Sequence, residues 1–234
     1  MSLNSLERLS EKETQKLARC LSALTSPKVL APNESLGWLG FDIGVVSSLY
    51  HVKTHVRSML QSKATDHSDI ADELYLAFLL GKMGLPQGFD LEAHAFMPEV
   101  VHHFSAVGGA LKWTPTFFEN DKYYVTPALR GSFSFTHFSK YQSRTATGDF
   151  ILSSRKFNNV GIYGGGSILR IFGTYDNGVV RSGLDRDPKL WTQRYFAGIN
   201  YDIVLRKNFE LGLSAEAAFM TDSQAYSLKT SLIF

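Results

Sequence analysis

The chain has 234 residues, a formal net charge of +2 and one cysteine. This length suits a single β domain or barrel, since such folds commonly run to about 200–250 residues. The basic residues are scattered, which excludes the clustered charge of a nucleic-acid binder, and the lone Cys20 excludes a disulfide framework and a cysteine-based zinc site.

The first predicted element is a short amphipathic helix at residues 10–25. Ser10 and Glu13 have capping-box spacing, and apolar side chains follow at helical intervals at Leu17, Cys20, Leu21 and Leu24. Pro27 ends this pattern. We therefore predict that residues 1–35 form an N-terminal periplasmic helix and linker, which lies below the following domain or partly enters it.

From about residue 36 apolar and polar residues alternate, which predicts an all-β body at 36–234. No run of about 18 apolar residues occurs, so no transmembrane helix is predicted. The alternation predicts ten strands, near residues 36–50, 74–84, 88–98, 104–118, 123–139, 146–157, 160–175, 190–206, 209–221 and 225–234.

Pro115 and Pro127 fall within two of these strands and predict a local distortion of the sheet. The clearest alternation is in strand 190–206. One face carries Tyr195 and Ile199, and the other carries Arg194 and Asp202.

The connections between predicted strands differ in length at the two ends of the array. The second, fourth, sixth and eighth are tight, whereas the long ones, about 51–73, the segment KYQSRTAT (140–147) and the segment after Tyr175, all fall at the other end. This asymmetry is typical of outer-membrane barrels and predicts both chain ends on the periplasmic side.

Two kinds of barrel fit the alternation. A soluble lipocalin-like barrel buries its apolar face, whereas a membrane barrel turns that face toward lipid. The polar face is rich in small residues, such as Gly40, Gly44, Ser132 and Ser134, which suits a narrow lumen better than a solvated surface. We therefore expect an antiparallel transmembrane β-barrel of about ten strands.

The last ten residues, AYSLKTSLIF, resemble the C-terminal assembly signal of bacterial outer-membrane barrels, with one face formed by Tyr226, Leu228, Leu232 and Phe234. The segments LGWLGFDIGV (36–45) and GLPQGFDLEAHA (84–95) also resemble strand openings in poorly characterised barrels of Gram-negative bacteria. The resemblance implies export, insertion by the barrel assembly machinery and residence in the outer membrane. It implies no activity.

The strand pattern also predicts which charged and polar residues line the lumen. These are Asp42, Asp90, Glu92, His94, Lys112, Arg130, Arg170, Arg194, Asp202, Glu216 and Lys229. They could form ion pairs that plug and stiffen the barrel, or a narrow polar path for ions or small solutes. We therefore predict an outer-membrane protein in the lipid bilayer that is either structural or porin-like, with a narrow pore. No cofactor is predicted, and the sequence does not indicate an oligomeric state.

An enzyme at the external rim remains an alternative. Ser105, His137, His102, His103 and Asp66 could gather there, but no nucleophile motif joins them, so no catalytic residue is assigned. His51 and His55 have i, i+4 spacing, yet loop histidines are usually solvated, and no metal site is assigned.

Overall fold

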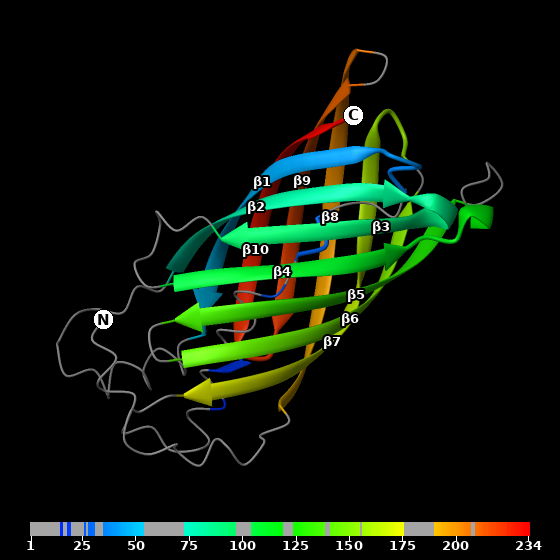
Figure 1. Cartoon of the computed structure of the whole chain (residues 1–234). Coiled ribbons are helices and arrows are strands. Elements are labelled where there is room, and N and C mark those ends of the chain that lie inside the picture. The colour runs from blue at the N-terminus through cyan, green and yellow to red at the C-terminus, as the bar shows by residue number, and fades with distance from the viewer. Residues whose placement is uncertain are drawn as a thin grey trace.

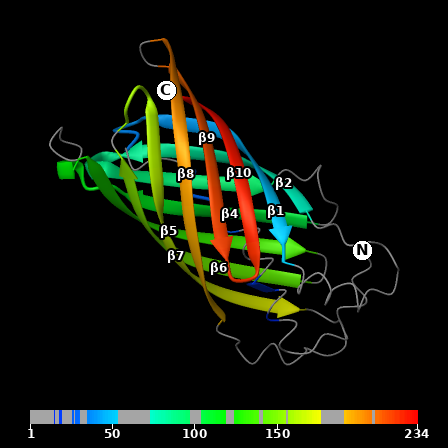
Figure 2. The same ribbon diagram turned by 180° about the vertical axis from the view of Figure 1, so that it is seen from behind.

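The computed structural model describes residues 15, 18–19, 26, 28–30, 35–53, 73–96, 104–118, 124–138, 141–154, 156–175, 190–206 and 209–234. These residues form a closed barrel in which each strand pairs antiparallel with its sequence neighbour and β1 closes on β10 (Figure 1; Figure 2 shows the opposite side). The prediction of a ten-stranded antiparallel barrel is confirmed.

The strands are β1 (Phe41–Val52), β2 (Glu73–Leu85), β3 (Phe89–Phe96), β4 (Phe104–Trp113), β5 (Val125–Phe138), β6 (Tyr141–Ser154), β7 (Val160–Tyr175), β8 (Leu190–Arg206), β9 (Phe209–Met220) and β10 (Ser223–Ile233). Two short 3-10 turns, η2 (Pro86–Gly88) and η3 (Thr116–Phe118), follow β2 and β4.

The segment 140–147, predicted to be a long loop, belongs mostly to β6. Ser143, Thr145 and Thr147 point inward and are buried, while Arg144 and Ala146 point outward. The segment pairs with β5 on one side and β7 on the other. Its hydroxyl residues resembled loop composition, but threonine is a good strand former and short hydroxyls suit a narrow lumen.

The two prolines do not interrupt the sheet, contrary to the prediction. Pro115 lies beyond the last residue of β4, so it breaks no strand. Pro127 pairs with Leu152 of β6, but the β4–β5 ladder extends only to Leu129, so residues 125–128 have a partner strand on one side alone. A proline is tolerated there because one side of the ladder has already ended.

The barrel has two distinct ends. At the loop end, the connections are 53–72, 97–103, 139–140, 176–189 and 221–222; at the turn end they are 86–88, 114–124, 155–159 and 207–208. Phe41 and Phe234 meet at the turn end, where their backbones exchange two hydrogen bonds of 2.6 and 2.9 Å. This contact completes the closure between β1 and β10 and leaves no free sheet edge there.

Most of the helix predicted at 10–25 lies outside the described residues. The three described positions within it, Gln15, Ala18 and Arg19, have helical backbone conformation. In the part of the chain that the structure describes, no helix is long and apolar enough to cross a membrane.

Candidate functional site in the barrel lumen

The eighth strand shows which face of the barrel points outward. Arg194 is fully buried inside, whereas its neighbour Tyr195 is 62% exposed outside. Asp202 is buried and Ile199 is exposed, following the same alternation. A barrel with an apolar exterior and a polar interior is built to meet lipid, as a transmembrane β-barrel does.

Ten of the eleven predicted lumen residues have inward-facing, buried side chains: Asp42, Asp90, Glu92, His94, Lys112, Arg130, Arg194, Asp202, Glu216 and Lys229. Arg170 was predicted there wrongly. It lies between the inward-facing Leu169 and Ile171, so the pleat of β7 turns it outward, with its guanidinium over the rings of Phe172 and Trp191.

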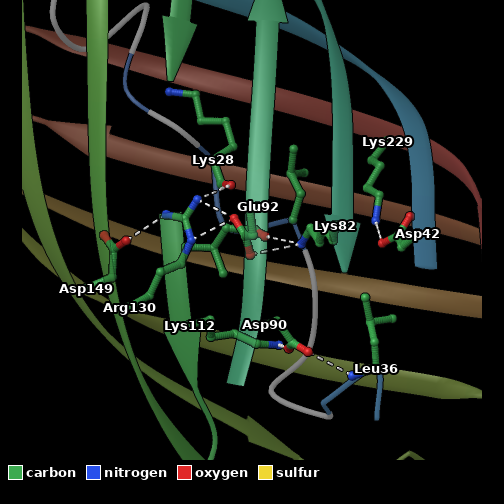
Figure 3. A network of polar contacts seen from close by, with 12 residues as sticks. Lys28, Leu36, Asp42, Lys82, Asp90, Glu92, Lys112, Arg130, Asp149 and Lys229 are labelled. Atoms are coloured by element: carbon green, nitrogen blue, oxygen red, sulfur yellow. Dashed lines mark hydrogen bonds and ion pairs between the residues drawn. The ribbon is translucent and has the colours of Figure 1, made fainter. Parts of the chain in front are cut away.

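The lumen contains a chain of ion pairs centred on Arg130 of β5 (Figure 3). Its Nε and Nη2 donate to Glu92 Oε2 at 2.9 and 2.6 Å, and its Nη1 donates to Asp149 Oδ2 at 2.8 Å. Arg194 of β8 donates to the other oxygen of Asp149, also at 2.8 Å. Charge-assisted hydrogen bonds thereby join four strands, β3, β5, β6 and β8, inside the barrel.

Further pairs continue toward the turn end. Lys82 lies 3.4 Å from Glu92, and Lys112 lies 2.9 Å from Asp90. The other pairs are Lys229 with Asp42, and Lys156 with Asp202. Both signs therefore alternate along the interior, and the buried charges compensate one another.

Lys82 and Asp149 were not among the predicted lumen residues, although each is central to this network. Lys82 lies on the inward face of β2 together with Phe78 and Leu80. Its apolar neighbours gave no sign of a polar face. Asp149 lies within the predicted strand 146–157, and its alternation with the outward-facing Phe150 and Leu152 is the signal that could have placed it inside.

A segment from the N-terminal part of the chain passes through this network. We call it the inner segment, consisting of residues 26 and 28–30, and all four side chains are buried. Three charged side chains of the surrounding strands form hydrogen bonds with its backbone at three successive residues. Arg130 donates to the carbonyl of Lys28 (3.4 Å), Lys82 donates to the carbonyl of Val29 (3.3 Å), and Glu216 accepts from the amide of Leu30 (3.0 Å).

The side chains of the inner segment contact the apolar part of the lumen. Val29 and Leu30 belong to a buried cluster that includes Val46, Phe78 and Phe196. The Lys28 ammonium lies 4.9 Å from the centre of the Tyr50 ring, and Ser26 accepts a hydrogen bond from Arg194. The chain itself therefore fills the lumen at this level.

The described positions on either side of the inner segment lie at opposite ends of the barrel. Ala18 packs with Ile171 and Leu190 at the loop end. At the turn end, Asp90 Oδ1 accepts hydrogen bonds from the Ser35 hydroxyl and the Leu36 amide. The described part of residues 1–35 thus runs from the loop end of the barrel, through the lumen, to the turn end.

Gly84 of β2 anchors the turn that leads from this segment into β1. Its amide donates to the Gly40 carbonyl at 2.8 Å, and its carbonyl accepts from the Leu39 amide at 3.2 Å. A Cβ at Gly84 would lie 1.8 Å from the Gly37 carbonyl oxygen. Only glycine permits this close approach of the two backbones.

A cavity of about 380 Å³ opens between the inner segment and the turn end. Leu30 and Leu36 form one wall, and the ion-paired Lys112, Lys229 and Asp202 line others. The lumen is therefore filled at the level of the inner segment and open between that segment and the turn end.

His94 is buried beside Phe78, with their ring centres 6.3 Å apart. A Cβ at Gly108 of the neighbouring strand would lie 2.3 Å from the His94 ring. Gly108 therefore provides the space for this imidazole, which makes His94 a packed wall residue.

The residues predicted for a rim enzyme are described only in part. Ser105 and His137 lie directly opposite each other on β4 and β5, and both are exposed. Asp66, His102 and His103 lie outside the described residues, as does His55 of the histidine pair. Among the residues that are described, no group of three or more His, Cys, Asp or Glu side chains could hold a metal ion.

No family model matches the chain, and neither does any curated protein sequence. Several solved structures are similar at low identity. An outer membrane channel from Pseudomonas putida F1 has a TM-score of 0.46 at 11% identity, over 89% of this chain and 99% of that one. The outer membrane protease OmpT from Escherichia coli has a TM-score of 0.38 at 10% identity, over 89% and 98%.

The attachment invasion locus protein Ail of Yersinia pestis has a TM-score of 0.28 at 14% identity, over 87% of this chain and 100% of that one. All these TM-scores are below 0.5, so no activity is transferred from any of them. The face polarity and the strand topology of this chain define it as a closed ten-stranded β-barrel of the outer-membrane type.

Proposed function

We propose that this protein is an outer-membrane pore for ions or small solutes that its own inner segment closes. The observation that carries the proposal is the binding of three successive backbone groups, at residues 28–30, by Arg130, Lys82 and Glu216. The inner segment belongs to no strand. It occupies the lumen as a bound peptide would and can leave without breaking a sheet ladder.

The strength of these contacts suits reversible closure. A hydrogen bond contributes about 0.5–1.5 kcal/mol net, and about 1.5–3 kcal/mol when one partner is charged. The three backbone contacts and the burial of Val29 and Leu30 hold the segment, while the wall keeps its own ion pairs when the segment leaves. The barrel therefore has a folded open state available.

Barrel size supports a narrow path. Eight strands leave room only for side chains and about sixteen make a wide aqueous channel, so a ten-stranded lumen is close to the closed limit. Removal of four or more residues of polypeptide from such a lumen leaves a path lined by Arg130, Glu92, Asp149 and Lys82. The cavity of about 380 Å³ at the turn end continues this path to the exterior.

The closing strand supports export and assembly. Four side chains of β10 and the residue after it point outward from the barrel: Tyr226, Leu228, Leu232 and Phe234. This outward aromatic and aliphatic row is the feature that resembles a signal for the barrel assembly machinery. We place the protein in the outer membrane of a Gram-negative bacterium on this basis, in contact with the lipid bilayer.

Planar-bilayer recording of the full chain tests the pore. Val29→Asp introduces a charge into the apolar cluster that holds the inner segment, so it should displace the segment and increase the fraction of time spent conducting. Leu39→Asp is the matched control, because Leu39 is 56% exposed in the turn before β1 whereas Val29 is 1% exposed.

Long closures in wild type, frequent openings in Val29→Asp and wild-type behaviour in Leu39→Asp are expected. A folded Val29→Asp barrel with no conductance would contradict the pore and leave a structural barrel.

A further inference from the structure

The outward face of β5, β6 and β7 carries two arginines and, next to them, a hollow. We propose that the arginines and the hollow together bind a phosphate-bearing anionic lipid. The three strands lie side by side (Figure 1). This inference rests on the barrel spanning a membrane but does not require that it conduct.

The two arginines are Arg144 of β6 and Arg170 of β7. Arg144 pairs with Phe172, and Arg170 pairs with Ala146, so the two arginines are diagonal neighbours on one face. Diagonal neighbours lie roughly 7–8 Å apart, within reach of a shared ligand. Both sit among rings: Arg144 lies 5.7 Å from Phe135, and Arg170 lies 4.8 Å from Phe172.

Neither arginine forms a salt bridge with a described carboxylate, and Arg170 Nε is buried without a hydrogen-bond partner among the described residues. Charged side chains are costly on the lipid face of a barrel, with a penalty that falls toward the membrane interface. Two guanidinium groups with no carboxylate partner among the described residues favour an anion at this place. Phosphate oxygens suit the planar fork of arginine.

A hollow lies two rows further along the same face. Gly131 and Gly148 are direct cross-strand partners, and both face outward. They line a shallow depression of about 490 Å³, largely open to the outside, whose apolar sides include Leu111, Leu129 and Phe150.

Packing does not explain the two glycines. A Cβ built at either position would meet no atom within 4 Å. Glycine within a strand weakens it, because it has high chain entropy and no side chain to pack. Their smallness instead leaves the hollow unfilled by the protein itself.

The arginines and the hollow lie on one line. Along β6 the outward positions are Arg144, Ala146 and Gly148, so only a methyl group separates the cationic pair from the hollow. Four residues of strand span about 13 Å. A lipid fits this spacing, with its phosphate between Arg144 and Arg170 and one acyl chain over Ala146 in the hollow.

Native mass spectrometry of the full chain, released from micelles containing equal phosphatidylglycerol and phosphatidylcholine, tests the site. The wild type should retain phosphatidylglycerol preferentially. Arg144→Gln and Arg170→Gln should each weaken retention about tenfold, the equivalent of one charge-assisted hydrogen bond. Arg206→Gln, an exposed arginine at the other end of the barrel, should leave retention unchanged.

The hollow has its own matched control. Gly148→Leu should fill it and lower retention, whereas Gly81→Leu should not, since Gly81 also faces outward with no atom within 4 Å of a Cβ but lies on β2. Folding of each variant is checked by its heat-modifiable mobility on gels.

Two further probes distinguish a lipid site from a free-anion site. Inorganic phosphate should not displace the lipid, and diacylglycerol should be retained less than phosphatidylglycerol. Equal retention of the two phospholipids, displacement by inorganic phosphate, or unchanged retention in the folded double arginine variant would each overturn the proposal. None of these results depends on the conductance measurement.

Discussion

The backbone amide of Leu30 donates a 3.0 Å hydrogen bond to Glu216 Oε2, although the two residues are 186 positions apart in the sequence. The same carboxylate oxygen accepts from the Tyr163 hydroxyl at 3.3 Å. Glu216 therefore connects the inner segment to β7 and β9. Hydrogen exchange at the Leu30 amide can therefore report whether the inner segment is bound.

Glu216→Gln should loosen the inner segment without reshaping the wall. The substitution keeps an oxygen acceptor but removes the charge, which weakens the bond to Leu30 by about 1 kcal/mol. Hydrogen exchange should show faster exchange at the Leu30 amide. Tyr163→Phe is the control, since it removes the other donor and leaves the Leu30 contact; equal exchange in both variants would argue against Glu216 holding the segment.

Asp149→Ala should strongly destabilise the barrel. It leaves Arg130 and Arg194 buried without their shared carboxylate, and breaking a buried ion pair by removing one partner costs about 3–5 kcal/mol. Urea unfolding in lipid vesicles measures the change.

Lys156→Met is the comparison for this experiment, because the Lys156–Asp202 pair at 2.8 Å includes a lysine that is partly exposed at the turn end. The loss should be smaller than in Asp149→Ala, because Asp202 keeps a 3.2 Å hydrogen bond from Asn200 and lines the turn-end cavity. A similar loss in Asp149→Ala and Lys156→Met would contradict the central role of Asp149.

Phe234→Ala should affect assembly more than stability. The Phe234 ring stacks on Phe41 and Phe209, with ring centres 5.8 and 6.2 Å apart, and each aromatic pair contributes about 0.5–1.5 kcal/mol. The refolded variant should therefore lose only a little stability, whereas its amount in the outer membrane should fall severalfold if Phe234 is part of the assembly signal. A matched variant at another exposed ring, Tyr195→Ala, should keep the wild-type amount.

The open pore should discriminate weakly between cations and anions. Among the described residues, six basic side chains line the lumen and its turn-end cavity, and seven acidic ones come close to balancing them. The basic ones are Lys82, Lys112, Arg130, Lys156, Arg194 and Lys229, and the acidic ones are Asp42, Asp90, Glu92, Asp149, Asp202, Glu210 and Glu216.

The reversal potential of Val29→Asp in a salt gradient should therefore lie near zero. Adding Lys229→Met to Val29→Asp leaves Asp42 unpaired and should shift the reversal potential toward cation selectivity. A strong preference for one sign before that change would show that the conducting path avoids this network.

The sequence determined the barrel and the direction of most of its side chains, because a strand repeats every two residues and each face meets a single environment. Arg194 and Asp202 could thus be placed inside and Tyr195 outside before any contact was known. The same logic failed at 140–147, where short hydroxyl side chains suit both a loop and a narrow lumen. It also failed at Arg170, because a charged side chain was assigned to the polar lumen although its position between Leu169 and Ile171 turns it outward.

Only the tertiary structure decided what the interior does. Alternation specifies a face but not a partner, so it could not show that Arg130 links Glu92 with Asp149, or that Lys82 completes the network. Nor could it place residues 28–30 in the lumen, because their hydrogen bonds are made by backbone groups, which every residue has. Such contacts leave no mark on side-chain periodicity and exist only once the closed barrel brings distant strands around one segment.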